Sequence, residues 1–247
     1  MSTPAGIIEL SLRGGRGPSR AFVFEPHRLA LPCWALATGG KPALLVTLDR
    51  HFDTVPPAAP PAHGWTVARY DEHARTQLNP RNTDHVLAAM EAGLVSDAIL
   101  FARSHPVGAV QAPSWTDSRG ATHELLASGL VDTISAEFGT EKASPEGRRA
   151  HELLHRAERV LLDADLDCFT SPSDADPTTA LPWPEDVIAA HVLPRGSEAF
   201  WSVVLEKCVG FTFAREPGHC GGLVAAGRLF EAAARVLFVQ LLKTDLP

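Results

Sequence analysis

The stretch Ala43-Leu44-Leu45-Val46-Thr47-Leu48-Asp49-Arg50-His51-Phe52-Asp53 joins an apolar run to three alternating side chains that can bind metal ions. Residues 43–48 have the continuous apolar character of a buried parallel strand. Every second side chain of a strand lies on the same face, so Asp49, His51 and Asp53 are predicted to converge where the strand ends. Because unpaired charges are costly to bury, this arrangement favours a cation site over a structural role.

A second apolar run with alternating carboxylates occupies residues 160–167, where the acidic positions are Asp163, Asp165 and Asp167. Two buried strands that both end in convergent carboxylates predict a site for two divalent metal ions. Such sites hold their ions about 3.5–4 Å apart and activate a water, so the expected reaction is hydrolysis of a polarised carbon centre. Asp and His donors suit Mn, Zn or Fe, and a mostly Asp set favours Mn²⁺.

Length and composition suit an ordinary α/β protein. The chain has 247 residues, is 45% hydrophobic and has a net charge of −7, which gives no indication of nucleic-acid binding. We see no domain boundary and expect residues 1–247 to form one catalytic domain. The four cysteines are widely spaced and are expected to be free thiols. The longest apolar stretch near the C-terminus is too short to cross a membrane and no signal pattern is present, so the expected location is cytoplasmic.

Strand and helix patterns alternate along the chain. Strands are predicted at 7–12, 21–24, 43–48, 96–102, 160–162 and 208–214, and helices at 29–37, 84–92, 145–159, 184–191, 196–206 and 223–242. This alternation predicts a three-layer α/β/α domain with a mostly parallel central sheet. Ligands bind at the carboxyl ends of the strands in such sheets, and His27, both acidic clusters and Glu216 all fall at strand ends.

Three motifs resemble a known family. Residues 25–32 (EPHRLALP), 48–53 (LDRHFD) and 162–169 (LDADLDCF), in that order, are similar to motifs of the arginase/deacetylase superfamily and its ureohydrolases. Closer still is a family long described as of unknown function, which includes the peptide arginases of ribosomal peptide natural-product pathways. The Gly-Gly-Asp-His motif of free-arginine arginases is absent, which argues against that branch. The resemblance implies an arginase/deacetylase-like fold and two Mn²⁺ ions per chain.

The resemblance also implies a ligand set. One metal would take His27 with Asp49 and Asp53, and the second would take His51, with Asp49 bridging the two. A late Asp-x-Asp pair would complete both shells, and either Asp163 with Asp165 or Asp165 with Asp167 fills that role. The second register is favoured because residues 165–169 resemble the family's run of Asp-x-Asp-small-large.

Two further roles follow from the same resemblance. Glu216 matches the glutamate that pairs with the substrate guanidinium, and a histidine is expected to carry a proton to the leaving amine. We choose His63 for that catalytic role, with His85 and His219 as rivals. The implied reaction converts an arginine of a peptide or protein, the expected partner, to ornithine and urea.

Two other functions remain open from the sequence. One is a deacetylase-like amide hydrolase that uses a single Zn²⁺ on the same fold. The other is a non-catalytic binding or maturation protein that binds metal weakly. Metal stoichiometry separates the first alternative from a two-metal arginase, and the sequence gives no oligomeric state.

Overall fold

Strands β3 (Ala43–Asp49) and β7 (Val160–Asp165) lie side by side at the centre of the sheet. The computed structural model describes residues 3–13, 15, 17–103, 112–174 and 179–244, and every residue of these two strands is buried in it. They pair in parallel, with Thr47 opposite Asp163 and Leu48 opposite Ala164. This register brings the two predicted acidic clusters to the same edge of the sheet.

The described residues form an eight-stranded sheet in the order β1-β2-β10-β7-β3-β4-β6-β5. The inner pairings are all parallel, and only the outermost pairs, β1 with β2 and β5 with β6, are antiparallel. The other strands are β1 (Ile8–Ser11), β2 (Arg20–Phe24), β4 (Val95–Ala102), β5 (Ser114–Thr116), β6 (Thr122–Ser128) and β10 (Cys208–Ala214), and β8 (Thr170–Pro172) and β9 (Ala180–Pro182) form a separate hairpin.

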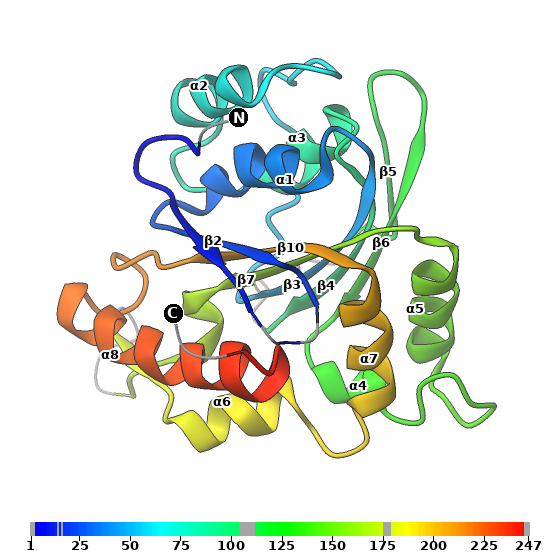
Figure 1. Cartoon of the computed structure of the whole chain (residues 1–247), viewed down its shortest axis with the longest axis vertical. Coiled ribbons are helices and arrows are strands. Elements are labelled where there is room, and N and C mark those ends of the chain that lie inside the picture. Colours follow the sequence, from blue (N-terminus) through cyan, green and yellow to red (C-terminus); the bar gives the residue numbers. More distant parts are fainter. Residues whose placement is uncertain (1–2, 14, 16, 104–111, 175–178, 245–247) are drawn as a thin grey trace.

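Helices cover both faces of the sheet (Figure 1). One layer contains α1 (Ala30–Thr38), α2 (Val67–Thr76) and α3 (His85–Glu91), and the other contains α4 (Val131–Ser135), α5 (Pro145–Arg156), α6 (Glu185–Val192), α7 (Glu198–Lys207) and α8 (Leu223–Ala234). Each layer has its own apolar core, one on either side of the buried strands. The predicted three-layer α/β/α fold with a mostly parallel sheet is therefore confirmed.

Local signals explain several element boundaries. Ser144 caps α5 by accepting a 2.8 Å hydrogen bond from the Gly147 amide, and Pro145 occupies the first helical turn, where its missing N–H costs nothing. Helix α8 is shorter than predicted because the segment 235–241 (η3, Arg235–Leu241) continues with π-helical bonding. The sequence prediction omitted α2, β5, β6 and the β8–β9 hairpin.

All four cysteines are buried and none is in a disulfide, as predicted. Among the described parts of the chain, no helix combines the length and apolar character needed to cross a membrane.

Candidate metal centre

The predicted site residues come from four neighbouring strands. His27 lies in a short 3₁₀ turn, η1 (His27–Leu29), just after β2, and Glu216 lies just after β10. Asp49 is the last residue of β3, and Asp165 is the last residue of β7. These strands are adjacent and parallel, so their carboxyl ends deliver the side chains to one place.

Three carboxylates surround one nitrogen of the His27 ring. Nδ1 of His27 lies 3.1 Å from Oδ2 of Asp165, 3.3 Å from Oδ2 of Asp49 and 3.4 Å from Oδ2 of Asp53. This nitrogen is buried and has no hydrogen-bond partner among the described residues. We call His27, Asp49, Asp53 and Asp165 the first ligand cluster; the ligand atoms of His27, Asp49 and Asp165 lie within 4.8 Å of one another, and Asp53 joins them through its contact with His27.

A second ligand cluster consists of Asp49, His51 and Asp167. Nδ1 of His51 lies 3.4 Å from Oδ2 of Asp167 and 3.8 Å from Oδ1 of Asp49. Oδ1 of Asp167 is buried without a hydrogen-bond partner among the described residues. Asp49 thus directs one carboxylate oxygen to each cluster, which is the arrangement expected of a bridging ligand.

Asp163 belongs to neither cluster, and the sequence-based option of Asp163 as a metal ligand is corrected here. Its Oδ2 accepts hydrogen bonds from Nε2 of His27 at 2.9 Å and from Oγ1 of Thr47 at 2.8 Å, and its Oδ1 accepts one from Thr212 at 2.5 Å. When Nε2 of His27 donates its proton to Asp163, the Nδ1 lone pair faces the first cluster. A carboxylate behind a ligating histidine commonly has this role.

The donor set fits divalent cations. Burial, and then the charge of Asp49, raises the pKa of Asp53 well above its ordinary value. Burial, and to a smaller extent the charges of Asp167 and Glu216, raises the pKa of Asp165 well above its ordinary value. Carboxylates that repel one another in a buried position are stabilised as anions by a metal ion, and the mixed oxygen and nitrogen donors match Mn, Zn or Fe.

Glu216 lies beside the clusters with one oxygen held and the other available. Its Oε1 accepts hydrogen bonds from the amide of His27, at 2.8 Å, and from the side chain of Asn82. Its Oε2 lies 3.8 Å from Nε2 of His219. The carboxylate is buried, and this burial raises its pKa.

Backbone strain is concentrated at this site. Among the described residues, five other than glycine have positive φ, and three of them are Asp53 (52°), Asn82 (58°) and Glu216 (33°). Such conformations are uncommon outside glycine, asparagine and aspartate and are found preferentially at functional sites. Asn82, which is not among the site residues predicted from the sequence, therefore belongs to the site as the residue that holds Glu216.

The histidines proposed for proton transfer lie in three different environments. The His63 ring lies against Gly93, in the turn that precedes β4, and lines a cavity with Ser96 and Asp97 at the amino end of that strand. Ligand clusters lie at the opposite, carboxyl edge, so the structure does not bring His63 to the site, and its choice as proton carrier is corrected. His219 lies in the loop before α8, where its side chain is exposed beside Glu216.

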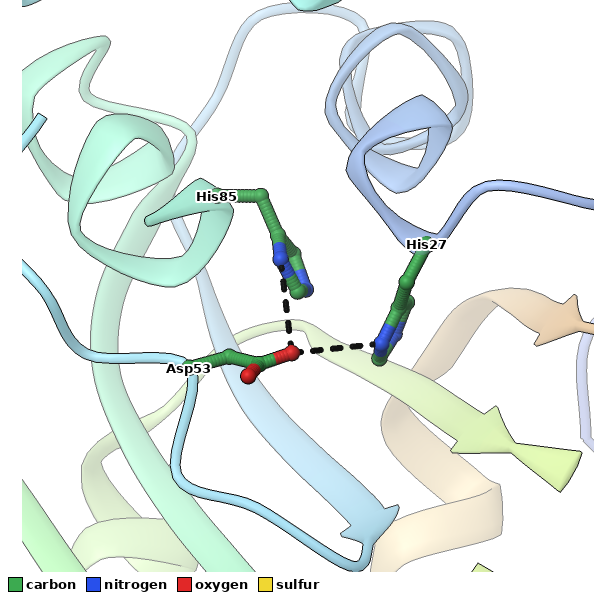
Figure 2. A group of neighbouring side chains, drawn as sticks. All are labelled: His27, Asp53 and His85. Atoms are coloured by element: carbon green, nitrogen blue, oxygen red, sulfur yellow. Dashed lines mark ion pairs between the residues drawn. The ribbon is translucent and has the colours of Figure 1, made fainter. Parts of the chain in front are cut away.

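His85 is fully buried behind the first cluster. Figure 2 shows its ring next to that of His27, with one carboxylate oxygen of Asp53 facing both rings; the ring centroids are 4.2 Å apart. Nδ1 of His85 lies 2.9 Å from the carbonyl oxygen of Asn82 and 3.6 Å from Oδ2 of Asp53. Burial and the neighbouring His27 lower the pKa of His85 to about 3. The ring is therefore neutral and enclosed, and one of its nitrogens lies within 4.8 Å of the ligand atoms of His27 and Asp53.

Comparisons with known proteins give matches at the level of structure. No protein-family model and no curated protein matches the sequence. Similar solved structures include proclavaminate amidino hydrolase from Streptomyces clavuligerus (17% identity, TM-score 0.44, 87% of this chain and 64% of that chain). Another is agmatine ureohydrolase of Thermoplasma volcanium (14% identity, TM-score 0.37, 88% of this chain and 63% of that chain).

The chain thus spans less than two thirds of the length of either structure. At these identities and TM-scores, assignment of a function depends on the geometry of the ligand clusters and Glu216.

The raised pKa values of Asp53 and Asp165 predict how metal binding depends on pH. Their folded-state pKa values exceed the unfolded ones, so without metal their contribution to stability is present below pH about 4 and is lost as pH rises through the raised values. Metal ions bind the deprotonated forms. The increase in Tm on adding Mn²⁺ is therefore expected to be larger at pH 8 than at pH 5.5, measured by thermal unfolding with and without chelator.

The difference between metal-bound and metal-free Tm is the quantity to compare. The pKa values of His73 and His191 are lowered by burial, so their contribution to stability increases from pH 5 to pH 7 in both forms and cancels in the difference. An increment in Tm that is equal at both pH values, or larger at pH 5.5, would contradict the assignment of Asp53 and Asp165 as ligands.

Proposed function

We propose that this protein hydrolyses the guanidinium group of arginine residues in a peptide or protein, giving ornithine residues and urea. The observation that carries the proposal is the pair of ligand clusters that share Asp49, with the buried carboxylate of Glu216 beside them. The motif resemblance supports arginine as the target and Mn²⁺ as the metal. A cytoplasmic location remains a prediction.

The proposed reaction assigns metal binding and substrate binding to different residues. His27, Asp49, Asp53 and Asp165 would hold one cation, and Asp49, His51 and Asp167 the other. When bound, the cations supply a water of lowered pKa and polarise the carbon that it attacks. Oε2 of Glu216 is free to pair with the substrate guanidinium by a charge-assisted contact, since Oε1 is held by His27 and Asn82.

His219 is the histidine best placed to give a proton to the leaving amine. It lines the cavity beside the second cluster, its Nε2 lies 3.8 Å from Oε2 of Glu216, and its side chain is exposed to solvent. His63 does not line this cavity, and His85 neither lines it nor is exposed to solvent. Positioned general acids contribute about 10²–10⁴-fold to a rate.

The proposal is tested by mass spectrometry on arginyl peptides incubated with the Mn²⁺-loaded protein. Each converted arginine is expected to lose the mass of one cyanamide unit, and urea is expected to accumulate in equal amount. Metal analysis of the same sample is expected to give two Mn²⁺ per chain. Two bound ions with no mass change on any arginyl peptide, or one Zn²⁺ per chain after growth with both metals, would overturn the proposal.

Replacing His219 with alanine is expected to lower kcat for urea release by about 10²-fold or more, with little change in KM. Added imidazole is expected to restore part of the lost rate. His63→Ala is the matched control, because that ring lies at the amino end of β4, and it is expected to behave like the unmodified protein. An increase in KM alone, without a loss of kcat, would show that His219 only contacts the substrate.

A further inference from the structure

A cavity of about 410 Å³ opens beside the second ligand cluster. Its lining includes His51 and Asp167 on the metal side and the loop of Gly218, His219, Gly221 and Gly222 on the other. The lining is mostly polar, and the proposed guanidinium partner Glu216 is 3.8 Å from one lining residue, His219. This cavity is therefore the place where the substrate would enter.

Arg50 is the one arginine or lysine among the described residues that line this cavity. Its position in sequence, between Asp49 and His51, fixes its backbone at the end of β3 next to both ligand clusters. Within the described parts of the chain, the guanidinium makes one long hydrogen bond, 3.4 Å from Nη1 to Oγ1 of Thr170, and no ion pair with a carboxylate. An arginine side chain has five N–H donors, so most of its donors are available to a ligand.

A cation at this position is unfavourable for a bare guanidinium substrate. The group to be hydrolysed is itself positive, and Arg50 repels it, whereas Glu216 attracts it. A substrate that carries a carboxylate as well as a guanidinium satisfies both residues at once. The planar fork of arginine is suited to bidentate contact with a carboxylate, a contact that fixes orientation as well as position.

We propose that Arg50 is a substrate-binding residue that selects guanidino substrates carrying a carboxylate. This inference rests on the proposed function, since it assumes that the guanidinium lies at Glu216. The carboxylate has two possible sources with the same chemistry: the α-carboxylate of an arginine at the C-terminus of a peptide, or the side chain of an acidic residue next to an internal arginine.

The test compares substrates that differ only in the carboxylate. L-Arginine and agmatine, its carboxylate-free counterpart, are the smallest pair. The peptide amides Gly-Arg-Gly and Gly-Arg-Asp form one pair, and Gly-Gly-Arg as the amide and with a free C-terminus forms the other, so the two pairs separate the two sources. In each pair, kcat/KM for urea release is expected to be about tenfold higher or more for the substrate with the carboxylate than for the one without it. The ratio of these two kcat/KM values is expected to fall towards one in Arg50→Gln, because a hydrogen bond to a charged group is lost.

Arg215→Gln is the matched control. It removes the same charge from a residue that follows β10 and lines a different cavity, so the ratio of kcat/KM values is expected to be retained. A ratio of one in the unmodified protein, or an equal loss for both members of each pair in Arg50→Gln, would overturn the proposal. An equal loss for both substrates would mean that Arg50 has only a structural role, through its hydrogen bond to Thr170.

A binding measurement separates failure of this inference from failure of the proposed function. Calorimetry with the Mn²⁺-loaded protein gives Kd values for L-arginine and agmatine whether or not urea is released. No urea from any substrate, together with preferential binding of L-arginine that is lost in Arg50→Gln, would refute the hydrolysis and support the carboxylate site. Urea release with equal Kd values for the two compounds would support the hydrolysis and refute the carboxylate site.

Discussion

Replacing Asp49 with alanine is expected to reduce urea release from an arginyl peptide by about 10³-fold or more, because metal ions contribute several kcal/mol of transition-state stabilisation. Asp49 directs one oxygen at His27 and the other at His51, so its loss weakens both ligand clusters at once. The measurement is the steady-state rate of urea release together with metal content per chain. Both are expected to fall while the far-UV circular dichroism stays that of the folded protein.

Asp163→Asn is the informative comparison for this variant. Asp163 is as buried as Asp49 but contacts the other nitrogen of His27, so its loss is expected to lower metal affinity only by about 10–100-fold, with activity regained at high Mn²⁺. If Asp49→Ala kept two ions and normal urea release, the two-metal site would be placed wrongly. If Asp163→Asn could not be rescued by Mn²⁺, Asp163 would be acting as a ligand.

Replacing Glu216 with glutamine is expected to lower kcat/KM for arginyl substrates by about 10–100-fold while metal content is unchanged. The substitution keeps the acceptor oxygen for the His27 amide but removes the charge that pairs with the guanidinium, and hydrogen bonds to charged groups contribute about 1.5–3 kcal/mol. Kinetics and metal analysis on the same preparation measure both effects.

Glu25→Gln is the control for Glu216→Gln. Glu25 is an exposed carboxylate near the same strand ends, paired with Arg215, and its neutralisation is expected to leave kcat/KM unaltered. Loss of Mn²⁺ from Glu216→Gln, with kcat/KM recovering when metal is added, would mean that Glu216 serves the metal ions and not the substrate.

The sequence was sufficient to predict the central part of this architecture. Buried parallel strands such as β3 and β7 have continuous apolar runs that are recognisable without context, and the side-chain period of two places their terminal carboxylates on one face. The same period could not separate Asp163 from Asp167, since both share a face with Asp165. The structure separates them because Asp163 lies two residues back along β7, where it meets Nε2 of His27, whereas Asp167 follows the strand in the 3₁₀ turn η2 (Leu166–Phe169).

Other features depended on packing between distant segments. Asn82 contacts Glu216 across 134 residues of sequence, and no local pattern marks such a pair. Only the closeness of His63 in sequence to β3 favours it as the proton carrier. The intervening proline-rich segment carries the chain to Gly93 at the far edge of the sheet, so closeness in sequence was a poor guide to closeness in space.

The left-handed backbone at Asp53, Asn82 and Glu216 has a consequence for engineering. Glycine accepts this conformation freely, whereas a residue such as glutamate loses about 1–2 kcal/mol in it, so a thermostability screen would favour glycine at positions that include a candidate metal ligand and the candidate guanidinium partner. Stabilised variants of this protein should therefore be selected with these three codons held constant, because the selection would otherwise raise thermal stability at the cost of activity.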